Sequence, residues 1–154
     1  MSNNFNEAYT AIDPGIPKET PDGDPLSDSD RSYAFEGYQI YQLSDETIGP
    51  ADLNDIEKAR LIFQCDVAND IDVVVNYVQD NDMGLPVPTL MANGNNEGVS
   101  HSFQVTKDAF AQGDNALINH KTYYFMALAY GYNNYQDYDP VTLAGQDLQY
   151  KASR

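Results

Sequence analysis

The sequence predicts an all-β fold, an antiparallel β-sandwich with long loops. Its longest apolar run, residues 122–133, is rich in tyrosine, phenylalanine and small residues, which suit a pleated, half-buried surface. Asparagine, histidine and glycine residues bound this run, as turn-forming residues do at the ends of strands. The chain has no heptad run and no internal repeat. A helix is the alternative for this stretch, but the run is short and aromatic for a helix.

The apolar run is expected to form a central strand. Taken by twos, one face carries Tyr123, Phe125, Ala127 and Ala129. The opposite face is also largely apolar, which is typical of a strand that is covered on both sides. We therefore expect this first set to be buried facing the second sheet, with Tyr38 and Ile40 across from it.

Further strands are expected where apolar residues alternate or cluster between turn signals, over residues 33–43, 59–66, 71–78, 99–106 and, as a short last strand, 141–143. Residues 79–98 contain Pro86, Pro88 and several Gly and Asn residues, and this pattern predicts a long loop. One helical turn is expected over residues 107–112. Cys65 falls in mid-strand and is expected to be a buried small hydrophobe rather than a nucleophile.

Two of these strands carry a family resemblance. The run Phe35-Glu-Gly-Tyr-Gln-Ile-Tyr-Gln42 resembles the third strand of a fibronectin type III-like domain, and Tyr123-x-Phe125-x-Ala127-x-Ala129 resembles the sixth strand. The pair is similar to modules of large secreted surface proteins of Bacteroidota, many of them exported by type IX secretion. The resemblance covers roughly residues 33–135. It implies an immunoglobulin-like extracellular sandwich, and the family has no catalytic residues in common.

Three regions are expected along the chain: an irregular, acidic, proline-rich segment over residues 1–32, the sandwich over residues 33–145, and a polar tail or linker over residues 146–154. The family places its first two strands before the Gly-Tyr strand. Here Pro14, Pro17, Pro21 and Pro25 lack the N–H groups that a strand ladder needs. We therefore expect the sandwich to be incomplete on its own, with a sheet edge that another segment of the parent protein or a partner chain completes.

The composition narrows the classes of partner. A formal net charge of −16, from 24 acidic and 8 basic residues, repels nucleic acid and anionic lipid. One cysteine and two histidines do not suffice for a zinc site of the usual kind. No apolar stretch is long enough for a membrane span, so membrane insertion is not expected. Residues 1–7 do not resemble a signal peptide, so an exported protein would have lost a signal encoded further upstream.

Two groups of side chains are candidate binding sites. Alternating carboxylates on a loop can gather oxygen ligands around calcium, the only cofactor that the sequence suggests, and the candidates are Asp22, Asp24, Asp28 and Asp30, with Asp137 and Asp139 as a second group. The alternative is a solvated acidic loop. Tyrosines clustered on one loop could stack on a sugar, and these are Tyr132, Tyr135 and Tyr138. The alternative is that they pack against the edge of the core.

The sequence contains no nucleophile elbow, phosphate-binding loop, Rossmann fingerprint or zinc-protease helix motif. We therefore expect no enzymatic activity. The expected role is that of a structural or adhesive module of a larger exported protein, extracellular or on the outer-membrane surface, that mediates protein–protein assembly. A calcium-stabilised carbohydrate-binding module is the first alternative, and a small hydrolase domain is the second.

Overall fold

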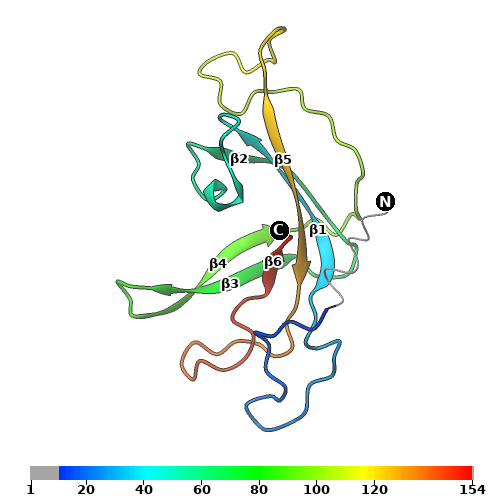
Figure 1. The fold of residues 1–154 in the computed structure, drawn as a ribbon, viewed down its shortest axis with the longest axis vertical. Coiled ribbons are helices and arrows are strands. Elements are labelled where there is room, and N and C mark those ends of the chain that lie inside the picture. The colour runs from blue at the N-terminus through cyan, green and yellow to red at the C-terminus, as the bar shows by residue number, and fades with distance from the viewer. Residues whose placement is uncertain (1–10, 154) are drawn as a thin grey trace.

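The computed structural model describes residues 11–153, and these are nearly all β. The strands are β1 (Ala34–Leu43), β2 (Ala59–Asp66), β3 (Val73–Asp80), β4 (Leu85–Asn93), β5 (Tyr124–Tyr132) and β6 (Tyr150–Ala152), with one short 3-10 helix, η1 (Pro50–Asp52). One antiparallel sheet has four strands in the order β2-β1-β5-β6, and the β3-β4 hairpin forms a second sheet. The hairpin projects sideways from the long strands β1 and β5 (Figure 1). The predicted all-β class is therefore confirmed, and the two sheets are consistent with a β-sandwich.

The strand at residues 33–43 and the strand at residues 59–66 were predicted almost to the residue, but the expected partners of β5 were wrong. Tyr38 pairs with Ala129 and Ile40 with Ala127 in the β1–β5 ladder, so these residues are neighbours in one sheet and do not face one another across two sheets. Along β5, Phe125 remains 42% exposed. The reason is that the second sheet covers only the far end of β5, where residues 128–131 are all buried.

The prediction of a long loop at residues 79–98 was wrong, because this segment contains β4. The strand carries Pro86 and Pro88, which argued against it in the sequence. The hydrogen bonds explain how both are tolerated. The Tyr77 N–H donates to the Asp147 carbonyl, away from β4, so its Cα partner Pro88 turns its nitrogen away from β3. Pro86 lies two residues earlier and points the same way, so neither proline interrupts the hairpin ladder.

Three other expectations were wrong. Residues 99–106 form no strand; the segment runs beside β2 and contacts it through the stacked rings of Phe63 and Phe103, 5.1 Å between centroids. Residues 141–143 form a turn, in which Leu143 has a φ of 60°. Residues 107–112 contain turns in place of a helical turn. The end of the chain is also more than a polar tail, since β6 pairs with β5.

The apolar core consists of two small clusters. Ile16 and Tyr33 form one, with partly buried hydrophobic residues around them, and Val74, Ala92 and Tyr130 form the other. The first cluster shows how the irregular N-terminal segment is held: Ile16 is buried, while the regular structure of residues 11–32 is limited to isolated bridges and turns. The irregular chain expected before residue 33 is thus confirmed for residues 11–32, and residues 1–10 lie outside the described part.

Polar side chains fill much of the space beside these clusters. Gln39 is buried and its amide donates to the Gln64 side chain at 3.0 Å and to the Met91 carbonyl at 2.8 Å, linking β1 to β2 and to the hairpin. Gln42, also buried, donates to Asp108 at 2.7 Å. Because so few large apolar side chains meet between the sheets, the two layers hold together by hydrogen bonds as much as by apolar burial.

Candidate assembly surface

An open groove separates the four-stranded sheet from the hairpin. It measures about 830 Å³, and the residues that line it are Gln39, Tyr41, Pro50, Leu53, Asn54, Leu61, Gln64, Asn76, Val78, Thr89, Leu90, Met91, Ala92, Asn93, Leu128, Tyr150 and Ala152. None of these side chains is charged. Leu61 is 49% exposed, Val78 48% and Leu90 61%, so the walls present aliphatic surface to solvent. Apolar surface gathered in a groove marks an interaction site more often than scattered apolar residues do.

The hairpin is anchored from its base as far as Tyr77 in the middle of β3, whose N–H donates to the Asp147 carbonyl. At the base, Val74 and Ala92 pack against Tyr130, and the rings of Tyr130 and Tyr150 stack at 5.2 Å. Within the groove, the Gln39 side-chain amide joins β1 to the hairpin by donating a hydrogen bond to the Met91 carbonyl. Beyond these contacts the hairpin diverges from β1 and β5 toward its tip (Figure 1). The second layer thus covers only part of the first.

The sheet edges differ in how they can pair with another chain. On β4, Pro86 and Pro88 face outward without N–H groups, so this edge lacks donors at these two positions. On β3, the bond from Tyr77 to Asp147 occupies part of the outer edge. At the other end of the four-stranded sheet, β6 has three residues.

The outer edge of β2 is the remaining candidate for pairing with another chain. The Val67 N–H donates to the Glu36 carbonyl and the Ser44 N–H to the Lys58 carbonyl, which fixes the alternation along β2. By that alternation Leu61 and Gln64 turn their backbone groups away from β1. Within residues 11–153, no backbone hydrogen bond reaches these two outward positions. This edge therefore has donors and acceptors available for a strand.

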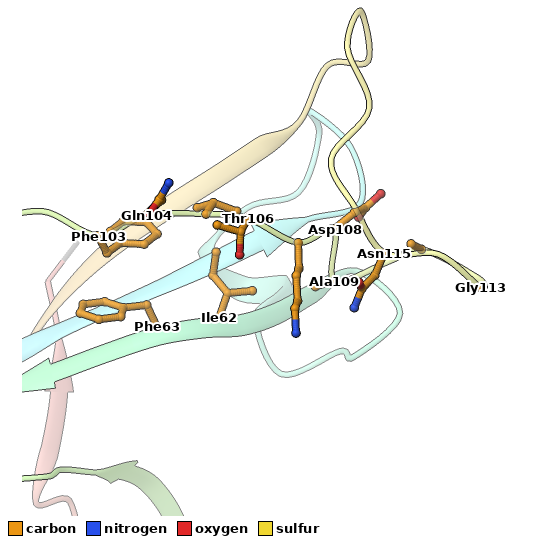
Figure 2. A pocket seen from close by; sticks show the side chains of 12 residues that line it. Ile62, Phe63, Phe103, Gln104, Thr106, Asp108, Ala109, Gly113 and Asn115 are labelled. Atoms are coloured by element: carbon orange, nitrogen blue, oxygen red, sulfur yellow. The ribbon is translucent and has the colours of Figure 1, made fainter.

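A narrow slot lies along the same edge (Figure 2). It is about 450 Å³ in volume, between Ile62 and Phe63 of β2 and the chain from Phe103 to Asn115. The slot keeps its shape because Asp108 is anchored: it accepts hydrogen bonds from Gln42 at 2.7 Å and from Lys121 at 2.6 Å. The hydrogen bond from Lys121 lowers the pKa of Asp108 below its ordinary value, so this carboxylate stays charged at neutral pH.

The predicted calcium ligands are not brought together. In the part of the chain that the structure describes, no three Asp, Glu, His or Cys side chains are placed to hold a metal ion, and that part includes Asp22, Asp24, Asp28 and Asp30. The Asp30 carboxylate is engaged locally, by the Ser27 N–H at 2.9 Å and the Ser27 hydroxyl at 2.6 Å. The second candidate group is likewise used in turns: Asp137 accepts from Asn134, and Asp139 from Val141 and Thr142.

The predicted sugar platform is divided among separate contacts. Tyr132 packs against the cluster of Val74, Ala92 and Tyr130. Tyr135 packs against Ile16 and Tyr33, and Tyr138 lies 4.5 Å from the ring of Tyr77. Tyr135 and Tyr138 share the wall of one shallow hollow of about 290 Å³, but Tyr132 is not among its lining residues. The three rings therefore do not form one flat surface, and the packing alternative describes them better.

The groove was not predicted from the sequence, because β4, which forms part of its wall, was expected to be part of a long loop. Leu85, Val87, Thr89 and Met91 alternate with the two prolines, and this alternation was the only available signal for β4.

Cys65 is buried, as expected, and its thiol lies 3.7 Å from the Ser100 carbonyl. Among residues 11–153 there is no helix with the length and apolar character of a membrane span. No protein-family model, curated protein or solved structure matches the chain.

Proposed function

We propose that this chain is a non-catalytic structural or adhesive module, fibronectin type III-like, of a larger exported cell-surface or extracellular protein. It acts in protein–protein assembly by receiving a segment of chain between its two sheets. The single observation that carries the proposal is the uncharged groove with Leu61, Val78 and Leu90 half exposed on its walls. In a complete sandwich such residues are buried by strands of the opposing sheet.

The order of the strands supports the family resemblance. In immunoglobulin-like sandwiches the third, sixth and seventh strands form one sheet. The strands that resemble the third and the sixth, β1 and β5, are neighbours, and β6 follows β5 as a seventh strand would. The opposing sheet of the family has four strands in the constant-type arrangement, whereas this chain supplies a hairpin. The missing strands would occupy the side on which the groove lies.

The charge of the chain supports an exported, soluble surface. A net charge of −16 keeps a protein with exposed apolar residues in solution, and it disfavours association between like copies at low salt. The segment that fills the groove is therefore expected to come from elsewhere in the parent protein or from a partner chain that is less acidic. A carbohydrate-binding role is supported less well, since the three candidate tyrosines lie apart.

Measurement of association tests the proposal. Without the segment that fills the groove, and at physiological salt, where the repulsion between copies is screened, sedimentation of the isolated chain at micromolar concentration should show self-association or a broad unfolding transition. The combined substitutions Leu61→Asn, Val78→Thr and Leu90→Asn should restore a monomer, because they remove the apolar walls of the groove. The matched control replaces residues outside the groove that are at least as exposed: Ile118→Asn, Val141→Thr and Leu143→Asn should leave the association unchanged. A wild-type chain that is monomeric and unfolds in one sharp transition would disprove the proposal.

A further inference from the structure

Glu36 is a carboxylate in an unusual position. It lies on β1 at the bulge opposite Gly131 and Tyr130, and its side chain is only 1% exposed. Its Oε2 accepts a hydrogen bond from the Asn69 amide at 2.9 Å, but its Oε1 is buried without a hydrogen-bond partner among the described residues. Buried carboxylate oxygens are ordinarily paired with a donor or bound to a cation, because their desolvation is costly. This oxygen is therefore an unsatisfied acceptor to which a cation could bind.

A second buried carboxylate lies beside it. Asp66, at the end of β2, is 2% exposed and accepts from the Asn95 N–H at 3.1 Å and from the Asn96 N–H at 3.1 and 3.2 Å. The turn that supplies these donors is shaped around the carboxylate: a Cβ on Gly94 would lie 1.9 Å from Asp66 Oδ2. A carboxylate has about four acceptor positions, so these bonds leave Asp66 able to bind a cation as well.

A short network joins the two carboxylates. Asn69 donates from its side chain to Glu36 and from its backbone to the Asn96 amide oxygen, and Asn96 in turn donates to Asp66. The Tyr130 hydroxyl lies in the same place, since a Cβ on Gly37 would be 2.9 Å from that hydroxyl and 3.0 Å from Asp66 Cα. Burial raises the pKa of Glu36, and the negative charge of Asp66 raises it further.

No cationic side chain balances this pair. Three ion pairs form among residues 11–153, and none of them involves Glu36 or Asp66. Two buried carboxylates without a counter-ion are unfavourable, and together they would neutralise one divalent cation. The Tyr130 hydroxyl lies nearby, and the Asn69 and Asn96 side chains belong to the same network, where their amide oxygens accept the Ile71 and Asn69 N–H groups.

We propose that Glu36 and Asp66 bind a calcium ion at the junction of β1, β2 and the turn at residues 94–96. The donor set consists of oxygen atoms alone, which a hard cation requires. The two carboxylates lie on strands, whereas Asn69 and Asn96 lie in loops and can adjust, which suits the irregular coordination of calcium better than the strict octahedron of magnesium. A site of two carboxylates and neutral oxygens differs from clusters of three or more acidic or histidine ligands, none of which occurs among the described residues.

The site has a structural consequence. Glu36 belongs to the central strand β1, Asp66 ends β2, and residues 94–96 follow β4. One ion would therefore join both sheets at the base of the hairpin. Its binding should raise the thermal stability of the chain by mass action, and chelation should loosen the hairpin from the four-stranded sheet.

Thermal unfolding with millimolar calcium or with excess EGTA tests the proposal. The wild-type Tm should rise in calcium, and this rise should vanish in Glu36→Gln and in Asp66→Asn. As a direct readout, terbium luminescence sensitised by tyrosine should appear in the wild-type chain. The affinity for terbium should weaken by at least about 10-fold in either variant, because a lost ligand costs no less than a lost outer-shell partner. The control combines Asp22→Asn, Asp24→Asn, Asp28→Asn and Asp30→Asn, and should keep both responses.

Three results would overturn the proposal. The first is a wild-type Tm that is indifferent to calcium and chelator, with no terbium signal. The second is a calcium response that survives in Glu36→Gln. The third is a response that is lost in the four-aspartate control, which would place the ion on the N-terminal loop. The terbium titration is carried out below the Tm, where the chain is folded. Glu36→Gln preserves the size of the side chain and its contact with Asn69. A loss of terbium binding in this variant would therefore not be explained by unfolding.

Discussion

The contact between the two sheets depends on very few apolar side chains, and two adjacent valines of β3 can measure it. Val74 is 2% exposed and packs against Ala92 and Tyr130, whereas Val73 is 51% exposed. Replacing either by alanine removes the same two methyl groups from the same strand. Both variants change the β-propensity of the strand equally. The difference between their free energies of unfolding therefore reports what the contact between the sheets contributes to stability.

The magnitude follows from the burial of the two methyl groups. Removing two fully buried groups at about 0.8 kcal/mol each loses about 1.6 kcal/mol, and the cavity left beside Tyr130 raises the cost of Val74→Ala to roughly 2–3 kcal/mol. At half exposure, the same change at Val73 should cost about 0.8 kcal/mol or less. The free energy of unfolding should thus separate the two variants by roughly 1.5 kcal/mol.

Urea unfolding followed by tyrosine fluorescence and circular dichroism measures both values, since the chain contains no tryptophan. The fluorescence readout includes Tyr130 and Tyr150, whose rings stack at this contact. Equal losses for the two variants would refute the reasoning. They would mean that the hairpin does not pack on the four-stranded sheet as the structure has it, or that the hairpin unfolds separately from the sheet.

Two further predictions concern the edges of the fold. Asp108→Asn should lower the stability at neutral pH by about 1–3 kcal/mol, because a buried hydrogen-bonding centre loses its charge. The pKa of Asp108 is depressed in the folded state, so the contribution is complete above the pKa of the unfolded carboxyl and is lost as the pH falls through the folded pKa; acid titration of wild type and variant should therefore converge. The double substitution Pro86→Thr and Pro88→Thr should promote aggregation, seen by thioflavin T fluorescence and light scattering, because it gives the outer edge of β4 two new N–H donors. Pro140→Thr, in an exposed loop, is the control, and aggregation no faster than in this control would contradict the assigned direction of the two prolines.

The strands with uninterrupted apolar patterns were predictable from the sequence. Residues 59–66 and the Gly-Tyr strand follow from local alternation alone, because a strand buried on one or both faces needs that pattern. The hairpin was not predictable in the same way. Its strand β4 tolerates two prolines only because their nitrogens point away from β3, a direction set by the register of the hairpin and visible in the Tyr77 N–H, which donates to the distant Asp147 and not to β4.

The candidate sites were less predictable than the strands. The spacing of Asp22, Asp24, Asp28 and Asp30 indicated calcium, but short polar loops satisfy their own carboxylates, as Ser27 does for Asp30. Glu36 looked like an ordinary polar residue in an alternating strand. Only the register of β1 against β2 and the position of the turn at residues 94–96 bring it beside Asp66. Tertiary contacts of this kind leave no local signal in one sequence.

The inequality of the strand edges also limits the size of any assembly. Polymerisation by strand pairing needs two complementary edges on every copy, one to accept and one to offer. In the described part of this chain, β2 has unoccupied backbone groups, while prolines block the outer edge of β4 and β6 is three residues long. The outer edge of β2 is therefore the edge best suited to strand addition. An assembly that uses the β2 edge alone terminates after one partner or closes as a symmetric pair, and it does not extend into fibres.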